Sequence, residues 1–366
     1  MIESVNMKIA IFAGGIREVG GGERLVLSMA EALNADLIVP SYSKTTVRHF
    51  GSEINIISLD KKLPKNYALA SIFSRQLFKK INFRDDYDFF VSVDNSYPLK
   101  KHRPHLLYCQ TPPRELYDMY HIVVNAQGTA SRRMMVKIWC IVNRFLDQNF
   151  VKKYVQNIAC NSHNVRNRIY KAYQKEAIVI YPPTRTESYK YKPSEGFWLS
   201  VNRIHPWKRI GLQIEAFRGM PHRRLKIVGD FSSTYAKKLV STAPENVEFL
   251  GNISEEQLKD LYSRCEGHIT TAIDEDFGLT AVEAMASGKP VVAVKEGGYL
   301  ETVLDGITGR LTAPVVNEII KSIEEVSTNP EKYKEACMER AKLFDYRVFK
   351  EQLEELVLNI YERGKN

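Results

Sequence analysis

Two carboxylates flank a glycine in the segment 275–292, which contains Glu275, Gly278 and Glu283. A helix is predicted to begin near Leu279, and the backbone N–H groups of a first helical turn lack partners and carry partial positive charge, so they can bind an anion. The glycine lets the backbone approach a ligand closely, and carboxylates form charge-assisted hydrogen bonds with sugar and ribose hydroxyls. The segment therefore predicts a site for phosphate and neighbouring hydroxyls; the alternative is a surface helix with an acidic first turn.

Two basic residues, Arg203 and Lys208, follow a predicted strand at Phe197–Val201. Two cations at a strand end, opposite a helix start, can bind a diphosphate, because guanidinium and ammonium groups form strong hydrogen bonds with phosphate oxygens. The alternative is that both are loop charges that contact water.

A third segment is rich in glycine, since Gly20, Gly21 and Gly22 follow a predicted strand at Lys8–Ala13. Small residues there let backbone amides meet an anion at the start of a helix. The spacing matches neither the dinucleotide-binding G-x-G-x-x-G pattern nor the phosphate-binding G-x-x-x-x-G-K-[ST] pattern. By itself such a glycine cluster is also typical of a mobile loop.

Alternating strands and helices must position these three segments. The predicted strands are 8–13, 36–39, 55–58, 89–93, 105–108, 157–161 and 177–180 in the first half, and 197–201, 225–228, 247–250, 267–271 and 290–294 in the second. Apolar residues at helical spacing predict helices between them, among them 134–155 and 255–264, and a helical tail from residue 316. The alternation predicts an α/β fold with two doubly wound parallel sheets, which bind ligands at the carboxyl ends of their strands.

A polar segment that begins after Tyr181-Pro182-Pro183 and extends to Pro193 divides the two series and is typical of an interdomain linker. A length of 366 residues also suits two domains. We therefore predict a first domain over 1–183, a second over 184–342 and a C-terminal segment over 343–366.

Positive charge is concentrated in the first half of the chain. The net charge is +9; residues 1–184 hold 26 Lys and Arg against 15 Asp and Glu, whereas residues 185–366 hold 26 against 28. This asymmetry predicts an anionic partner for the first half, and a membrane surface rich in acidic lipid would serve. A solvated basic face is the alternative, and no nucleic acid is expected because the basic pairs match no recognition motif.

The composition also excludes several classes of protein. No apolar run is long enough to cross a bilayer, and the polar N-terminus does not resemble a signal peptide. Five cysteines are scattered without a C-x-x-C pair, so neither a zinc site nor a disulfide framework is indicated. We expect a cytoplasmic protein, with peripheral contact on the inner face of the membrane.

Taken together, these motifs resemble the retaining glycosyltransferases of family 4, whose fold is called GT-B and consists of two Rossmann-like domains with a cleft between them. The resemblance covers nearly the whole chain in the family's order. It rests on the glutamate pair with Phe277-Gly278-Leu279 between its members, on Arg203 and Lys208, on Gly20-Gly21-x-Glu23-Arg24, and on the segments 226–230, 297–301, 305–309 and 344–349.

The resemblance implies a role for each of the charged residues. Glu275 would hold hydroxyls of the transferred sugar, and Glu283 would hold the ribose of the donor nucleotide. Arg203, Lys208 and the amides around Gly278–Thr280 would stabilise the leaving diphosphate, where charge develops in the transition state. The acceptor would attack on the same face of the sugar, so the anomeric configuration is retained without a clear enzyme nucleophile.

The resemblance also assigns the domains. The second domain would bind the nucleotide sugar, the first would bind the acceptor, and the last helix would cross back to the first domain. No cofactor and no metal are expected, and Asp274-Glu275-Asp276 is a coincidental likeness to the metal-binding D-x-D of another transferase fold. The remaining residues implied on the donor side are Gly20, Gly21, Phe277, Leu279 and Thr280.

One segment narrows the substrate. Tyr108–Asp118 is similar to a motif of GDP-mannose-using members, Y-C-H-T-P-x-R, with Gln110 in place of the histidine and with Arg114 at the arginine. Glutamine can hydrogen-bond a hydroxyl but cannot take a proton near pH 7, so Gln110 and Arg114 are expected on the acceptor side.

The predicted reaction moves a hexose, mannose from GDP-mannose, to a lipid-linked or surface glycan. A UDP donor stays open. A nucleotide-sugar epimerase and a non-catalytic nucleotide-sugar-binding subunit are the alternatives, the second of them suggested by Gln110.

Overall fold

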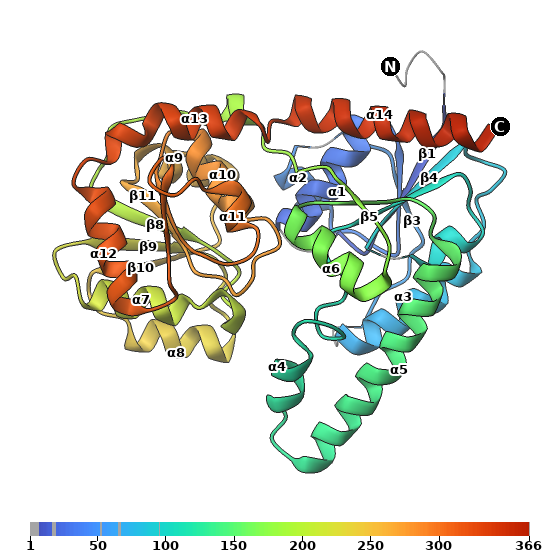
Figure 1. The fold of residues 1–366 in the computed structure, drawn as a ribbon, viewed down its shortest axis with the longest axis horizontal. Helices are drawn as coiled ribbons and strands as arrows, with labels where there is room; N and C mark the ends of the chain where they lie inside the picture. The colour runs from blue at the N-terminus through green and yellow to red at the C-terminus, as the bar shows by residue number, and fades with distance from the viewer. Residues whose placement is uncertain (1–6, 17–19, 52, 65–66, 95, 366) are drawn as a thin grey trace. The chain divides into compact units, whose positions relative to one another are not determined.

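The computed structural model describes residues 7–16, 20–51, 53–64, 67–94 and 96–365 (Figure 1). The chain divides into two compact units. Unit 1 comprises Met1–Tyr181 together with Phe349–Asn366, and unit 2 comprises Pro182–Val348. Each unit is built around one parallel sheet, so each has its own carboxyl edge at which ligands can bind.

Unit 1 contains a seven-stranded sheet in the order β3-β2-β1-β4-β5-β6-β7. Every neighbouring pair is parallel, with Ala10 opposite Phe90 and Val91 opposite Leu106 in the centre. The chain leaves β1 in one direction and β4 in the other, which places the point of reversal between these two strands. The strands are β1 (Ile9–Phe12), β2 (Asp36–Val39), β3 (Ile56–Ser58), β4 (Phe89–Val93), β5 (His105–Cys109), β6 (Ile158–Cys160) and β7 (Ile178–Val179).

Side chains cap the first turns of some helices of unit 1. Ser162 accepts the Val165 N–H at 3.0 Å at the start of α6, and Thr129 accepts the Arg132 N–H at 3.3 Å at the start of α5. The helices are α1 (Gly21–Ala32), α2 (Lys44–His49), α3 (Tyr67–Lys80), α4 (Tyr120–Asn125), α5 (Ala130–Tyr154), α6 (His163–Tyr173) and α14 (Tyr346–Lys365), with a 3₁₀ turn η2 (Tyr97–Lys100).

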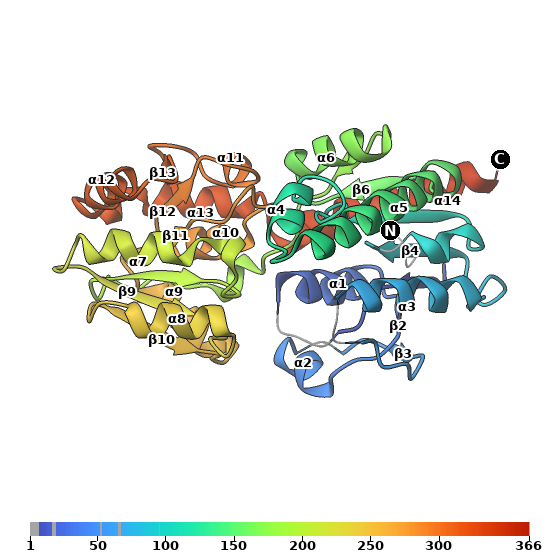
Figure 2. The same cartoon turned by 90° about the horizontal axis from the view of Figure 1, so that it is seen from below.

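The last helix, α14, belongs to unit 1 from Phe349 onward. It buries an apolar stripe formed by Phe349, Leu353, Val357 and Ile360. Figure 1 shows α14 on one side of the unit 1 sheet and α5 on the other, and Figure 2, seen from below, shows α5 in front of α14. In the described part of the chain no helix is long and apolar enough to cross a membrane.

Unit 2 contains a six-stranded sheet in the order β10-β9-β8-β11-β12-β13, again with parallel pairs. The chain reverses direction between β8 and β11, so the loops that follow these two strands lie side by side. The strands are β8 (Phe197–Val201), β9 (Arg224–Val228), β10 (Val247–Gly251), β11 (Gly267–Thr270), β12 (Val291–Val294) and β13 (Gly309–Thr312).

The helices of unit 2 cover this sheet. A capping box fixes the start of α9, where Ser254 and Gln257 exchange hydrogen bonds. The elements are α7 (Ile210–Arg218), α8 (Thr234–Thr242), α9 (Glu255–Arg264), α10 (Leu279–Ala286), α11 (Tyr299–Thr302), α12 (Val316–Ser327) and α13 (Lys334–Lys342), with 3₁₀ turns η3 (Thr186–Ser188), η4 (Pro206–Lys208) and η5 (Pro330–Tyr333).

Candidate functional site

The loop after β11 and the turn after β8 meet through a short ion pair. Lys208, the last residue of η4, donates from Nζ to Oε2 of Glu275 at 2.6 Å. Both side chains are partly exposed, Lys208 to 28% and Glu275 to 20%. The structure therefore brings together two predicted site residues that lie 67 positions apart in the sequence.

Backbone hydrogen bonds hold this turn and this loop against each other. The Ile273 N–H donates to the Trp207 carbonyl at 2.8 Å, and the Thr271 hydroxyl donates to the Lys208 carbonyl at 2.9 Å. Buried Gln213 of α7 donates to the Thr271 hydroxyl at 2.9 Å. The backbone around Lys208 is thus fixed independently of the ion pair that its side chain makes.

Glu296, in the loop after β12, forms hydrogen bonds with the turn after β8 and with the loop after β11. It accepts Nη1 of Arg209 at 3.0 Å on both carboxylate oxygens and the Asp274 N–H at 3.2 Å. The Gly298 N–H donates to the Glu275 carbonyl at 2.7 Å in the same loop pair. Sequence reasoning missed Glu296, although its position two residues past the end of β12 is the signal that could have found it, because ligand-side residues follow the carboxyl ends of parallel strands.

Glycines let the loops after β11 and β12 touch at the backbone. Gly297 has a φ of +58°, and an added Cβ would lie 2.4 Å from the Glu275 carbonyl oxygen. At Gly298 an added Cβ would lie 2.4 Å from the Phe277 Cα. Side chains at these two positions would displace the loop that carries Glu275, because real Cβ atoms do not come so close to backbone.

Helix α10 begins beside this loop at Gly278, whose φ is +96° and which places no side-chain cap on the first turn. Leu279 and Thr280 open the helix, as predicted, and their N–H groups belong to its first turn. The Glu283 carboxylate is buried on the second turn and accepts the Tyr262 hydroxyl at 2.9 Å. Glu283 is therefore placed by Tyr262, a partner that the sequence did not single out.

Arg203 lies on the same edge of the sheet with an exposed side chain. Its loop passes close to Gly229, whose φ is +149° and where an added Cβ would lie 1.9 Å from the Asn202 carbonyl oxygen. Burial, and then the positive charges of Arg203 and Lys208, lower the pKa of the nearby His205 imidazole. The turn after β8 therefore carries a positive potential that favours an anion.

In unit 1 the structure brings the glycine segment and Gln110 together. Gly20 precedes α1 and Gly21 opens it, and an added Cβ at Gly22 would lie 3.1 Å from Oε1 of Gln110. Nε2 of Gln110 donates to Asp94 at 2.7 Å, and its backbone N–H donates to the same carboxylate at 2.6 Å. Asp94 directly follows β4, and sequence reasoning missed it.

Arg114 is held by a neighbouring carboxylate. It donates to Oδ2 of Asp118 from Nε at 2.9 Å and pairs with it through Nη2 at 2.8 Å. Arg168 of α6 lies 3.9 Å from the same oxygen and donates to the Thr111 hydroxyl at 3.0 Å. Two guanidinium groups therefore share Asp118, and a role of Arg114 toward an acceptor stays a prediction.

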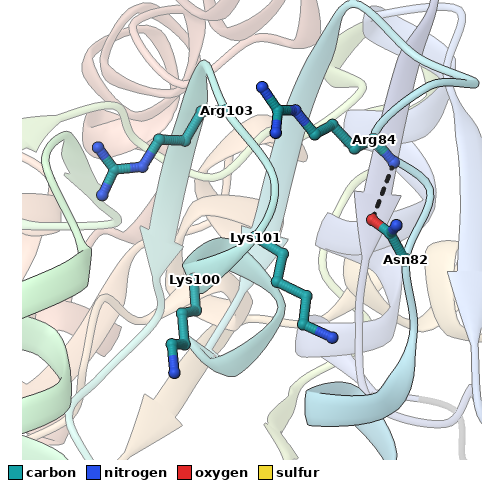
Figure 3. A pocket seen from close by; sticks show the side chains of 5 residues that line it. All are labelled: Asn82, Arg84, Lys100, Lys101 and Arg103. Carbon is teal, nitrogen blue, oxygen red and sulfur yellow. Dashed lines mark hydrogen bonds between the residues drawn. The ribbon is translucent and has the colours of Figure 1, made fainter.

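Two neighbouring basic residues of unit 1, Lys100 and Lys101, lie away from the predicted site. Together with Asn82, Arg84 and Arg103 they line a pocket of about 420 Å³ (Figure 3). These residues precede β4 and β5, so the pocket lies at the amino edge of the unit 1 sheet. Because Gln110 and Gly21 lie at the carboxyl edge, this basic pocket is separate from the predicted site.

Over the residues that the structure describes, no group of three or more His, Cys, Asp or Glu side chains is arranged to hold a metal ion. The Asp274-Glu275-Asp276 segment is instead engaged with neighbouring loops, through the Asp274 N–H to Glu296 and through Glu275 to Lys208.

The family described as "Glycosyl transferases group 1" matches residues 166–344. These matched residues, called here the group 1 domain, include residues 166–181 of unit 1 and nearly all of unit 2. This group 1 domain contains the Lys208–Glu275 pair, Glu283, Arg203 and Glu296.

Two relatives indicate the breadth of this similarity. The alpha-1,3/1,6-mannosyltransferase ALG2 of Dictyostelium discoideum is 25% identical in an alignment that covers 85% of this chain and 88% of that protein. The lipopolysaccharide 1,2-N-acetylglucosaminetransferase of Salmonella typhimurium is 33% identical over 185 residues, which cover 43% of this chain and 48% of that protein. The chain thus spans about half the length of the second relative.

Solved structures show the fold of nearly the whole chain. HepE of Anabaena, in complex with UDP and glucose, is similar with a TM-score of 0.73 at 21% identity, covering 97% of this chain and 100% of that chain. The sucrose-phosphate synthase of Thermosynechococcus elongatus is similar with a TM-score of 0.77 at 17% identity, with the same coverage. These structures show that the chain has the GT-B fold. The family match and the mannosyltransferase relative show a glycosyltransferase and do not favour an epimerase or a non-catalytic subunit.

Proposed function

We propose that the chain transfers a hexose, mannose from GDP-mannose, to a lipid-linked or surface glycan with retention of configuration. The observation that carries the proposal is the ion pair of Lys208 and Glu275 at the carboxyl edge of the unit 2 sheet. It supports the proposal because a cation suited to a diphosphate stands against a carboxylate suited to sugar hydroxyls, beside the start of α10.

The ion pair suggests how a donor would engage the site. A diphosphate carries more negative charge than a carboxylate, so it would take Lys208 as its partner and release Glu275 to accept hydrogen bonds from sugar hydroxyls. Arg203 and the first N–H groups of α10 would bind the same diphosphate. Glu283, oriented by Tyr262, would bind the ribose hydroxyls.

Transfer would then depend on electrostatic stabilisation of the leaving group. The acceptor oxygen forms a bond to the anomeric carbon as the bond from that carbon to the phosphate oxygen breaks, and the acceptor proton passes to the departing oxygen. Because negative charge grows on the diphosphate during this step, Lys208 and Arg203 stabilise the transition state more than the ground state. Gln110 is not required as a base and would orient the acceptor hydroxyl.

The domain roles follow the same proposal. Residues 184–342 would bind the donor, and Phe277, Leu279 and Thr280 would contact it around the helix start. Residues 1–183 would present Gly20, Gly21, Gln110 and Arg114 toward donor and acceptor. The name of the Dictyostelium relative supports mannose, whereas the ligands of the Anabaena structure are UDP and glucose, so the donor must be tested rather than assumed.

Thermal unfolding in the presence of GDP, UDP, ADP, GDP-mannose and UDP-glucose tests the donor. A ligand at 100 times its dissociation constant stabilises the folded state by about 2.7 kcal/mol, and we expect this shift with GDP and GDP-mannose alone. A shift with UDP and UDP-glucose instead would replace mannose by another hexose. A shift without sugar transfer to any acceptor would favour the non-catalytic subunit, and donor epimerisation without an acceptor would favour the epimerase. No shift with any nucleotide would contradict the proposed donor site.

A matched pair of variants tests the diphosphate role. Lys208→Ala should weaken binding of the nucleoside diphosphate by about 1.5–3 kcal/mol, the range for a hydrogen bond to a charged group. Lys192→Ala is the control, because Lys192 makes a comparable pair with Asp260 at 2.7 Å elsewhere in unit 2. Equal affinity in the Lys208 variant and the parent, measured by calorimetry, would remove Lys208 from the proposal.

A further inference from the structure

The outer face of α5 exposes apolar side chains in its first two-thirds. Seven of them are between 46% and 65% exposed, and Ile122 of α4 is 43% exposed. The seven recur at helical spacing and so form one continuous face. They are Met134, Met135, Ile138, Ile141, Val142, Phe145 and Leu146.

The inner face of α5 is the more polar one. Its buried residues are Cys140, Asn143, Asp147 and Val151. Asp147 accepts the hydroxyls of Tyr117 and Tyr173, each at 2.8 Å. A helix on the surface of a globular protein normally turns its apolar side inward, so α5 is inverted over this stretch, and its outer face is suited to apolar surroundings.

Charge distinguishes the segment as sharply as hydrophobicity does. Residues 119–146 contain Arg132, Arg133, Lys137 and Arg144 and no Asp or Glu. The first three of these basic side chains are exposed. An apolar face bordered by cations, with no carboxylate, is the composition that binds the interface of an anionic bilayer.

The topology places the start of α5 at the predicted acceptor edge of the unit 1 sheet. Helix α5 joins the carboxyl end of β5 to the amino end of β6, so α4 and the start of α5 lie on the same edge of the unit 1 sheet as Gln110. Figure 1 shows α4 and the first half of α5 projecting beyond the sheet of unit 1.

We propose that this helical hairpin, residues 120–146, docks unit 1 on an anionic lipid surface by inserting the exposed face of α5 among the headgroups. This docking rests on the proposed function, because it would bring a lipid-linked acceptor to Gln110. A second copy of the chain is a poorer occupant of the face. Self-association would bring the same cations of two copies together, with no carboxylate in the hairpin to pair with them.

Flotation with lipid vesicles tests the docking without any sugar donor or acceptor. The full chain should float with phosphatidylcholine vesicles that contain 30% phosphatidylglycerol, should float at least tenfold less with pure phosphatidylcholine, and should be released by salt. Ile138→Glu/Phe145→Glu should reduce binding at least tenfold, because two charges would replace apolar contacts. The control is Leu300→Glu/Ile307→Glu, two comparably exposed apolar residues of unit 2.

A second pair of variants tests whether vesicle binding depends on the charges of the hairpin or on the net charge of the chain. Arg132→Gln/Arg133→Gln should lower binding by about fivefold for each lost charge. Lys100→Gln/Lys101→Gln removes the same charge at the basic pocket of Figure 3, on the opposite edge of the sheet, and should leave binding unchanged. Equal losses in the two variants, or no loss in the Ile138/Phe145 variant, would overturn the proposal.

The same variants distinguish the other outcomes. A parent chain that is dimeric by light scattering, and monomeric as Ile138→Glu/Phe145→Glu, would assign the face to a second copy and overturn the lipid proposal. Vesicle binding that is lost while the thermal shift with nucleotide is kept would support docking, and it would show that the variants are folded. Vesicle binding without any nucleotide shift would contradict the proposed function and leave docking intact.

Discussion

The loops at the carboxyl edges of the two sheets are built in different ways. In unit 2 the loops after β8, β11 and β12 are joined by the Lys208–Glu275 pair, by Glu296 and by backbone contact at Gly297. In unit 1 an added Cβ at Gly14 would meet no atom within 4 Å among the residues that the structure describes. The difference teaches that the unit 2 edge is fixed in advance by several contacts between its loops, as stabilisation of a developing charge requires. The unit 1 edge holds Gln110 on Asp94 but leaves room at Gly14.

The largest expected effect is on the chemistry at the fixed edge. Glu275→Ala should lower the rate of sugar transfer by about 10²–10³, the range for removing one preorganised group that acts in the transition state. Affinity for the free nucleoside diphosphate should not fall, because Lys208 loses a competing partner. Transfer rates and calorimetry measure the two quantities, with Glu248→Ala on β10 as the control, and unchanged turnover would sink the assignment of Glu275.

The second prediction compares glycines of the two edges. Gly298→Ala should lower the free energy of unfolding by about 2–4 kcal/mol, because its Cβ would overlap the Phe277 backbone. Gly14→Ala in unit 1 should change it by less than about 0.5 kcal/mol. Urea denaturation of both variants measures the contrast, and similar losses would mean that the two edges do not differ in packing.

The third prediction concerns one buried histidine in each unit. Burial lowers the pKa of His268 in unit 2 to about 3 and that of His105 in unit 1 to about 4. The unfolded chain binds these protons below its ordinary histidine pKa of about 6.5, so stability is present above that pH and is lost as the pH falls toward the folded values. The loss is about 1.4 kcal/mol per pH unit for each histidine.

Denaturation between pH 6.5 and 5 checks this loss. His268→Gln and His105→Gln should each reduce the decline in the free energy of unfolding by about 1.4 kcal/mol per pH unit. Below pH 4 only His268 should still contribute, because its pKa lies lower. A decline as steep as that of the parent in both variants would contradict the assignment of neutral, buried imidazoles.

The smallest effect is expected at the open edge. Asp94→Asn should raise the KM for the acceptor by about three- to tenfold, because Gln110 loses a charge-assisted hydrogen bond. Affinity for the nucleotide should stay unchanged. Asp88→Asn is the control. Asp88 lies at the other end of β4, and its carboxylate accepts the Lys8 N–H at 2.8 Å. Weaker nucleotide binding in the Asp94 variant would place Asp94 on the donor side instead.

The sequence predicted the elements whose apolar pattern is uniform. The strands 36–39, 89–93 and 197–201 agree residue for residue with β2, β4 and β8, because strands buried on both faces are continuous apolar runs. The helix 255–264 agrees with α9, because its apolar residues recur at helical spacing. The edge strand β13 was missed, since half of its residues are only partly buried, and α4 was missed because it has only six residues.

The candidate site was predictable in its residues but not in their partners. The positions of Arg203, Lys208, Glu275 and Glu283 relative to strand ends and a helix start could be read from the pattern. That Lys208 meets Glu275 depends on how two loops 67 residues apart close on each other, which no local pattern encodes. The inversion of α5 was equally hidden, because helical spacing shows that an apolar face exists and does not show which way it points.

The return of α14 to unit 1 has a consequence for the order in which the protein can be made. A ribosome delivers residues up to Tyr181 first, but the stripe of Phe349, Leu353 and Val357 that packs in unit 1 emerges only after unit 2. Unit 1 therefore lacks the packing of α14 while unit 2 is synthesised. A chain cut between unit 2 and this stripe would leave exposed the apolar surface of unit 1 that the stripe covers.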